Sequence, residues 1–391
     1  MATITAPGAQ VAAASALKPA SQRLLSLDLL RGATIAGMIL VNNAGDEPSA
    51  YWPLKHAEWN GWTPTDLVFP FFLFMVGVAM TFSLASRLKR GDSRQQLVKH
   101  IVWRGVLLFV IGVVLHALPF PHLATLRIYG VLQRIAICYV ISGIVALWVG
   151  KRGQWAIILA CLAGYWIIMR HVPVPGFGVP THGFPLLDPD RNLVAWLDRK
   201  LLMGRLYEVT RDPEGLISTI PAIATCLLGL RTGDWLRSDR SPQAKAAGLA
   251  IFGVIGFIAG EVMNIWFPIN KKLWTSSFVV LTAGLALIFL AVCYWLVDIK
   301  QWKRWATPFV VFGVNSIAAY VFAEFVAHLL YGFSVRTADG DVQTWQDWIY
   351  RHAFAPLGSP ANASLLYALT FVAICWVAMW VLYRKRIFLK I

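Results

Sequence analysis

Apolar runs of about 20 residues recur along the chain, and they constrain its fold more than any other feature. A helix of that length crosses the hydrocarbon core of a bilayer, which is about 30 Å thick. The chain is 58% hydrophobic and only 14% charged, a composition that excludes an ordinary soluble domain. We therefore expect an all-α fold, a polytopic transmembrane helical bundle. About ten spans are predicted, near residues 27–44, 65–86, 98–117, 128–149, 154–170, 215–233, 246–267, 275–297, 307–331 and 365–383.

Charges in the connecting loops predict how the bundle is oriented. The two chain ends and every second loop carry 20 Lys and Arg but 4 acids, whereas the other, longer loops carry 12 of each. Short basic loops lie in the cytoplasm. We therefore expect both termini to be cytoplasmic, and loops 45–64, 170–214 and 332–364 to face the periplasm or an equivalent lumen.

The remaining composition limits the domains and partners. Residues 1–22 are rich in Ala and Pro and lack the apolar core of a signal peptide, so they are predicted to be a disordered cytoplasmic tail. Residues 23–391 form one transmembrane domain. The formal charge of +15 is not collected in one stripe, so we expect no nucleic acid partner. Neither the cysteines nor the histidines have the spacing of a common metal site, so no metal is expected.

His56 is the clearest candidate for chemistry, because it lies in a loop between the first two spans and precedes Asp66 by ten residues. A neutral imidazole can take a proton from an attacking amine or hydroxyl, and a nearby carboxylate can fix its tautomer. Asn42 or Asn43, at the end of the first span, could donate a hydrogen bond to an oxyanion developing on an acyl carbonyl. Trp59 is the kind of side chain that stacks on sugars. The alternative is an ordinary solvated loop histidine.

Charged side chains within the predicted spans should face the bundle interior, because charge is costly in hydrocarbon. These residues are Arg104, Arg134, Glu261 and Glu324. Arg134 could pair with Glu261 or Glu324, or could bind a substrate. Asp28 and Arg31 lie on one helical face and can pair; alternatively, Arg31 faces an anionic ligand that enters from the cytosol.

Several motifs together resemble one family. They are SLDLLRG, ILVNNAG and LKHAEWNGWTPTDLVFPFFLFMVG within 26–77, YGVLQRIAICY (129–139), DPEGLISTIPAIATCLLG (212–229), NKKLWTSSFV (270–279) and FGVNSIAAY (312–320). The order and coverage are similar to those of the heparan-alpha-glucosaminide N-acetyltransferase family of transmembrane acyltransferases. The bacterial branch, which lacks the lumenal N-terminal domain of the lysosomal enzyme, is the most similar. This resemblance implies a multi-pass protein of the bacterial inner (plasma) membrane and a homodimer.

The resemblance also implies a reaction. Acetyl-CoA on the cytoplasmic side would be the co-substrate, and the acceptor would be the amine of glucosamine or a glucosamine-containing glycan on the other side. The family's active histidine corresponds to His56 and its asparagine best to Asn42, with Asn43 as an alternative. His56 acts either as the general base of a direct transfer or as the acetyl acceptor of a ping-pong reaction; Asn42 and Asp66 slightly favour the direct transfer. The predicted donor-binding residues are Arg31, Arg104, Asn43 and Arg134, and the predicted acceptor-binding residues are Trp59, Asn60, Glu261, Asn270 and Asn315.

Two other functions remain open at this point. One is a transporter of N-acetylglucosamine or a related sugar, although the sequence lacks the internal repeat that many transporters show. The other is O-acetylation of an envelope polysaccharide, which uses the same donor and differs in its acceptor.

Overall fold

A computed structural model describes residues 24–120, 124–181, 185–337 and 340–389. The predicted tail, residues 1–22, lies outside these ranges. The long helices are α1 (Leu25–Asn42), α2 (Val68–Lys89), α3 (Arg94–His116), α4 (Val131–Trp148), α5 (Lys151–His171), α7 (Thr219–Leu236), α8 (Pro242–Met263), α9 (Ser276–Cys293), α11 (Ser316–Gly332) and α13 (Pro360–Arg384). The shorter elements are α6 (Leu193–Leu201), α10 (Thr307–Val314), α12 (Trp345–Ile349) and a hairpin of β1 (Ser334–Arg336) and β2 (Val342–Thr344).

The all-α fold is confirmed, and two of the predicted spans differ in detail. Among the described helices, eight are long and apolar enough to cross a membrane, or nine if α10 and α11 together count as one span. The predicted span 307–331 is broken between these two helices, which are bent by 71°. The predicted span 215–233 forms α7, which is not in that set because it includes the ion pair of Arg231 and Asp234.

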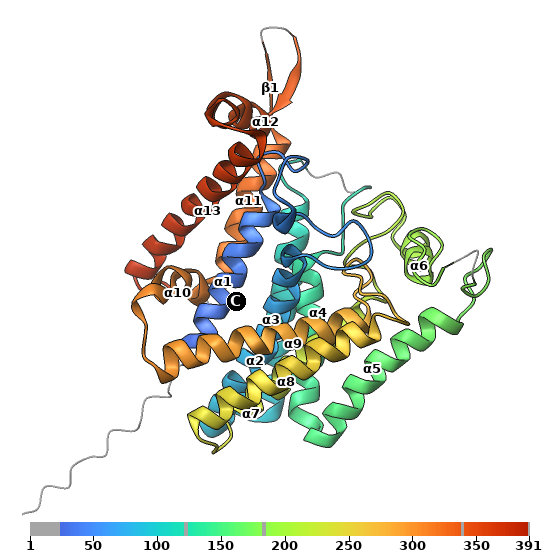
Figure 1. The fold of residues 1–391 in the computed structure, drawn as a ribbon, viewed down its shortest axis with the longest axis vertical. Helices are drawn as coiled ribbons and strands as arrows, with labels where there is room; N and C mark the ends of the chain where they lie inside the picture. The colour runs from blue at the N-terminus through green and yellow to red at the C-terminus, as the bar shows by residue number, and fades with distance from the viewer. Residues whose placement is uncertain (1–23, 121–123, 182–184, 338–339, 390–391) are drawn as a thin grey trace, which may run out of the picture.

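Helices pack in closely fitted pairs, of which α1 with α10, α2 with α7, and α8 with α9 are the most extensive (Figure 1). Small residues allow this close approach, as they do in many membrane bundles. A Cβ atom added to Gly32 of α1 would lie 1.8 Å from the carbonyl oxygen of Phe309, and one added to Gly313 would lie 1.9 Å from that of Asp28. The two glycines therefore fix how closely α1 and α10 approach.

The outer helices present apolar side chains to their surroundings, as lipid contact requires. In the most apolar 18-residue stretch of α3, of α5 and of α13, only 28% of the residues are buried inside the molecule. The share is 22% in α8 and 72% in the segment of α2. The loops that connect α1 to α2 and α5 to α7 lie together at one end of the bundle (Figure 1).

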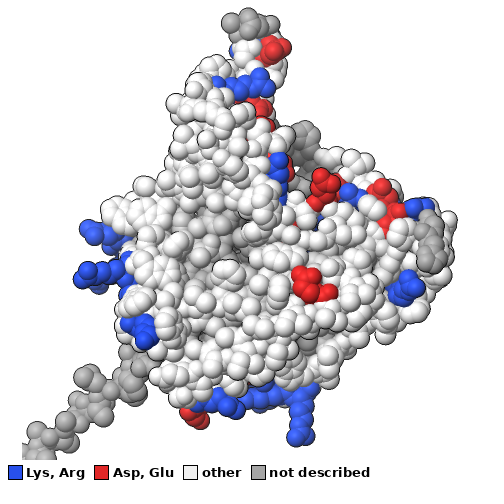
Figure 2. All heavy atoms as spheres, in the orientation of Figure 1, with Lys and Arg blue, Asp and Glu red and all other residues white. Residues whose placement is uncertain are grey.

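Charged side chains are unevenly distributed over the surface. Figure 2 shows a band of Lys and Arg along the lower edge, beneath α7 and α8, and most of the visible acidic side chains on the upper part of the molecule, toward the long loops. This separation agrees with the loop charges in the sequence and gives the two ends of the bundle different electrostatic character.

Candidate functional site

The loop between α1 and α2 is fixed by short helical turns at Trp52–Leu54 and Pro64–Leu67. Thr63 precedes the second turn, and its hydroxyl donates a hydrogen bond to the carbonyl of Lys55 at 2.6 Å. The backbone N–H groups of Thr63 and Ala57 both donate to Asp66 Oδ2 at 3.0 Å. One oxygen of the Asp66 carboxylate is thus held by the loop that carries His56.

The other oxygen of Asp66 contacts His56. Asp66 Oδ1 lies 2.7 Å from His56 Nδ1, and the side chain of Asp66 is only 1% exposed. An ionised carboxylate can only accept, so His56 donates from Nδ1–H and carries the lone pair on Nε2. The His56 side chain is 38% exposed and can meet a ligand. The pairing of His56 with Asp66, which the sequence suggested, is present.

Lys271, between α8 and α9, is the third member of this group. Its Nζ lies 3.1 Å from His56 Nε2, 2.9 Å from His56 Nδ1 and 3.6 Å from Asp66 Oδ1. Burial lowers the pKa of the Lys271 ammonium below its ordinary value, although Asp66 and Glu214 act in the opposite direction. An amine that gives up its proton more easily than usual therefore lies against the imidazole.

Asn270 joins this loop to the one that carries His56. Its side-chain amide donates to the carbonyl of Trp59 at 3.0 Å and to Asn60 Oδ1 at 3.2 Å, and it is fully buried. The N–H of Gly61 adds a bond to the carbonyl of Ile269 at 2.7 Å. Trp59, Asn60 and Asn270 were predicted from sequence as acceptor-binding residues, and the structure brings all three together beside His56.

The loop between α6 and α7 covers Trp59. The guanidinium of Arg211 lies 4.8 Å from the Trp59 ring centre and pairs with Glu208, which also pairs with Lys272 at 2.8 Å. The indole N–H of Trp59 donates to the carbonyl of Leu187 at 2.7 Å. Trp59 is therefore held in place by contacts on its ring and on its nitrogen.

The two candidate asparagines at the end of α1 differ in their surroundings. Asn43 is buried, and its amide donates to the carbonyl of Ile39 in its own helix at 2.8 Å. Asn42 is exposed. Neither makes a hydrogen bond to His56 in the part of the chain that the structure describes, so the oxyanion role predicted for Asn42 stays a prediction.

The predicted donor-binding arginines lie in separate places. Arg31 donates to Asp28 at 2.7 Å and to the carbonyl of Gly313 at 2.8 Å, which confirms the predicted pairing with Asp28. Arg104 donates to the hydroxyl of Tyr139 at 3.2 Å. Both side chains help to connect helices, α1 to α10 and α3 to α4.

Arg134 is fully buried on α4 and does not pair with Glu261 or Glu324, so that expectation is wrong. Its guanidinium lies 5.1 Å from the ring centre of Trp274, and Nη2 donates to Ser218 and to the Gly215 carbonyl in the segment before α7. Its Nε and Nη1 atoms, and both polar atoms of the neighbouring Gln133, have no hydrogen-bond partner among the described residues. Buried polar atoms of this kind call for a ligand or water.

The remaining predicted acceptor-binding residues are not all close to His56. Glu261 accepts a hydrogen bond from the indole N–H of Trp62 at 3.2 Å, on the loop of His56. Asn315 lies at the break between α10 and α11, and both polar atoms of its amide bind the backbone of the C-terminal segment, at Ile387 and Leu389. The Asn315 amide is therefore used to hold that segment.

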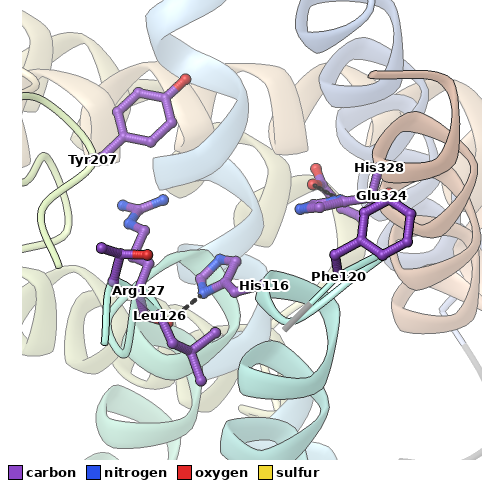
Figure 3. A pocket seen from close by; sticks show the side chains of 8 residues that line it. His116, Phe120, Leu126, Arg127, Tyr207, Glu324 and His328 are labelled. Atoms are coloured by element: carbon purple, nitrogen blue, oxygen red, sulfur yellow. Dashed lines mark hydrogen bonds and ion pairs between the residues drawn. The ribbon is translucent and has the colours of Figure 1, made fainter. Parts of the chain in front are cut away.

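A cavity of about 350 Å³ lies among α3, α11 and the loops beside them (Figure 3). Glu324 and His328 enter it from α11, opposite Arg127 and His116. The Nδ1–H groups of His116 and His328 donate to backbone carbonyls at 2.9 and 2.7 Å, so in the neutral form each Nε2 keeps an accepting lone pair. The lining residues are His116, Phe120, Thr125, Leu126, Arg127, Tyr207, Glu324 and His328.

Arg127 is neutralised by neighbouring carboxylates. It makes two hydrogen bonds to Asp212, at 2.6 and 2.9 Å, and one to Glu214 at 2.6 Å. Burial lowers the pKa of the guanidinium, but the two carboxylates outweigh it and raise the pKa above its ordinary value. With the Arg127 charge offset in this way, Glu324 and the Nε2 atoms of neutral His116 and His328 give the cavity hydrogen-bond acceptors, which suit a hydrogen-bond-donating ligand.

Sequence reasoning missed Lys271 and the group around Arg127. Lys271 directly follows Asn270, and two adjacent lysines stand in the short loop after α8 on the more acidic side of the bundle. Two positive charges on the more acidic side of the bundle could have identified Lys271 as a candidate site residue. For Arg127, Asp212 and Glu214 there was no comparable signal, because the carboxylates are 85 and 87 residues away in sequence.

Comparison with known proteins adds evidence independent of this geometry. The profile of the family described as "Heparan-alpha-glucosaminide N-acetyltransferase, catalytic" matches residues 23–267. The chain is 31% identical to the heparan-alpha-glucosaminide N-acetyltransferase of Homo sapiens, and 31% identical to the protein of that name from Mus musculus. Both alignments cover 96% of this chain and 61% of the relative, so the chain spans less than two thirds of the length of these relatives.

Proposed function

The chain belongs to the heparan-alpha-glucosaminide N-acetyltransferase family, and we propose that it moves an acetyl group across a membrane to an amino sugar. The donor is acetyl-CoA on the cytoplasmic side. The acceptor is the amine of glucosamine or of a glucosamine-containing glycan on the opposite side, which is the periplasm if the membrane is a bacterial inner membrane.

The observation that carries this proposal is the bond between His56 and Asp66. Asp66 accepts from His56 Nδ1 at 2.7 Å while two backbone N–H groups hold its other oxygen. This arrangement directs the basic Nε2 atom of an exposed imidazole away from the carboxylate. An imidazole oriented in this way is suited to take a proton from an attacking amine.

The direct transfer proceeds in one addition and one elimination. The acceptor amine attacks the thioester carbonyl, and His56 Nε2 takes the proton that the nitrogen loses. The C–S bond then breaks, and the proton on His56 passes to the leaving thiolate of CoA. Asp66 stabilises the imidazolium that exists between these two steps, and Asn42, as the exposed amide at the end of α1, is assigned to the carbonyl oxygen.

Buried polar groups support a path for the donor between the helices. Between α3, α4 and α7, Gln133 and Arg134 present donors and an acceptor that have no hydrogen-bond partner in the described part of the chain. The pantetheine arm of CoA carries two amides that could complete these hydrogen bonds, while the charged nucleotide stays near the basic end of the bundle. Threading only the arm avoids moving several negative charges into hydrocarbon.

The acceptor is proposed to approach over the loops at the opposite end. Trp59 provides an aromatic wall near His56, and Asn60 lies next to it. The cavity at Glu324 provides acceptors for the ammonium and hydroxyl groups of a further sugar unit. An ammonium bound beside a carboxylate distinguishes a further unit with a free amine from one that is N-acetylated.

The proposal is tested in proteoliposomes with acetyl-CoA on one side and glucosamine on the other. We expect N-acetylglucosamine to form only when acetyl-CoA faces the basic end of the protein. His56→Gln should reduce the rate about 10²–10⁴-fold, the usual contribution of a general base. His352→Gln is the matched control, because His352 is exposed and its ring hydrogen-bonds and stacks within its own segment, at Trp348.

Full transfer by His56→Gln would exclude the proposed site. Sugar flux without acetyl-CoA would indicate the transporter instead, and acetylation of glucose hydroxyls at the same rate as the glucosamine amine would indicate O-acetylation.

A further inference from the structure

Lys271 Nζ lies where an attacking amine has to be. A general base acts on a proton that it reaches across about 2.6–3.2 Å. Lys271 Nζ is 3.1 Å from His56 Nε2, the ring atom that carries the lone pair. The protein therefore holds one of its own amines within reach of the base assigned to the acceptor.

The surroundings of Lys271 make its ammonium easier to deprotonate than that of an exposed lysine. Its side chain is 18% exposed, and burial lowers the pKa of the ammonium, opposed by Asp66 and Glu214 and reinforced by the neighbouring Lys272. A desolvated lysine next to another cation is a recognised way of activating an amine for reaction with carbonyl compounds.

The neighbouring Lys272 provides an internal control for the reactivity of Lys271. It is the next residue, but its ammonium is paired with Glu208 at 2.8 Å rather than with His56. The Lys272 nitrogen is thus directed to a carboxylate, whereas the Lys271 nitrogen lies against the base. The two adjacent lysines therefore differ in their access to His56.

We propose that Lys271 is a site of self-acetylation when no acceptor sugar is present. The inference rests on the proposed use of acetyl-CoA. Lys271 Nζ attacks the thioester carbonyl, His56 Nε2 takes the proton from the nitrogen, the C–S bond breaks, and the proton passes to the CoA thiolate. The products are acetyl-Lys271 and free CoA, and no oxidant or other reagent is needed.

Acetylation of Lys271 changes the site in two ways. It removes a positive charge next to His56 and Asp66, and it adds an amide to the space beside the imidazole. Acetyl-Lys271 therefore obstructs the place of the acceptor amine and slows transfer. An acceptor sugar that is already bound prevents the modification by occupying that place.

The experiment incubates the purified full-length protein with acetyl-CoA, without acceptor, and measures the acetylated fraction of each lysine by peptide mass spectrometry over time. We expect acetyl-Lys271 to form at least about tenfold faster than acetyl-Lys272, and His56→Gln to slow it about 10²-fold. Excess glucosamine should suppress acetylation in the unmodified protein, whereas N-acetylglucosamine should not; this arm needs no variant and is independent of folding defects.

Equal acetylation of Lys271 and Lys272, or an equal rate in His56→Gln, would overturn the inference, because both indicate unassisted chemical acetylation. Transfer to glucosamine is measured on the same sample. If glucosamine is acetylated while Lys271 is not, the inference fails and the proposed function stands. If neither is acetylated, both fail.

Discussion

Two charged clusters lie on the loop side of this bundle, and they differ in what they can do chemically. In the cluster of His56, Asp66 and Lys271, an imidazole lies against an amine whose pKa burial lowers, and the His56 side chain is 38% exposed. In the cluster of Arg127, Asp212 and Glu214, the guanidinium stays charged, and three hydrogen bonds to carboxylates hold it. The first cluster is suited to proton transfer, and the second to holding loops and shaping the cavity.

The comparison predicts that altering the first cluster changes catalysis while altering the second changes stability and binding. The largest effect is expected from Asp66→Asn. The amide would donate to His56 Nδ1, which moves the ring proton to Nε2 and removes the basic lone pair. We expect kcat to fall about 10²–10⁴-fold with little change in the KM for acetyl-CoA, measured as steady-state transfer. Glu58→Gln, an exposed carboxylate in the same loop, is the control; an equal loss in both variants would argue against the assigned role of Asp66.

Arg127→Gln is expected to have the next largest effect, on stability. It leaves Asp212 and Glu214 without their cation in a buried setting, and breaking such a pair costs about 3–5 kcal/mol. The thermal unfolding midpoint in detergent should fall clearly, whereas it should stay constant in Arg351→Gln, which changes an exposed arginine. An unchanged midpoint in Arg127→Gln would mean that this cluster contributes no net stability.

Glu324→Gln tests whether the cavity binds the acceptor. The substitution keeps the shape of the side chain and removes its charge, and a hydrogen bond to a charged group is worth about 1.5–3 kcal/mol. We therefore expect the KM for a glucosamine disaccharide, which supplies the further sugar unit, to rise about 10–100-fold, with kcat at saturation maintained. Asp341→Asn removes an exposed acid from the β1–β2 hairpin and should leave KM unchanged. An unchanged KM in Glu324→Gln would separate the cavity from acceptor binding.

Trp59→Phe should have the smallest effect. It keeps an aromatic ring under Arg211 but loses the bond from the indole nitrogen to the Leu187 carbonyl. A neutral hydrogen bond of this kind contributes about 1 kcal/mol. Limited proteolysis of the loop between α5 and α7 should therefore be about fivefold faster, and Trp52→Phe, at a largely exposed position, should not change it. No acceleration would show that other contacts hold this loop.

The sequence predicted the helical class and the pairing of His56 with Asp66, because both depend on short-range patterns. Periods of apolar residues define spans, and ten residues separate the two side chains in one loop. The same reasoning failed for Arg134, which pairs with neither Glu261 nor Glu324. The position of a charged residue within its predicted span indicated how deep it lies in the membrane. It did not indicate which neighbouring helix the side chain faces.

Lys271 illustrates the other limit of sequence reasoning. It is separated from His56 by 215 residues, and only the packing of the loop after α8 against the loop before α2 brings their nitrogens within 3.1 Å. Asn270 fixes that contact through its hydrogen bonds to Trp59 and Asn60. The sequence does not predict which residues an asparagine in a loop will bind.

The sequence by itself determined that this chain forms membrane-spanning helices, that its loops differ in charge, and that His56 has a carboxylate nearby. Hydrophobic length, charge and local spacing are properties of the chain, and they hold in any packing of its helices. Only the tertiary structure decided that Lys271 lies against His56 and that Arg127 is neutralised by Asp212 and Glu214. Those contacts arise from the closeness of segments far apart in sequence, which depends on how helices such as α1 and α10 fit together at Gly32 and Gly313.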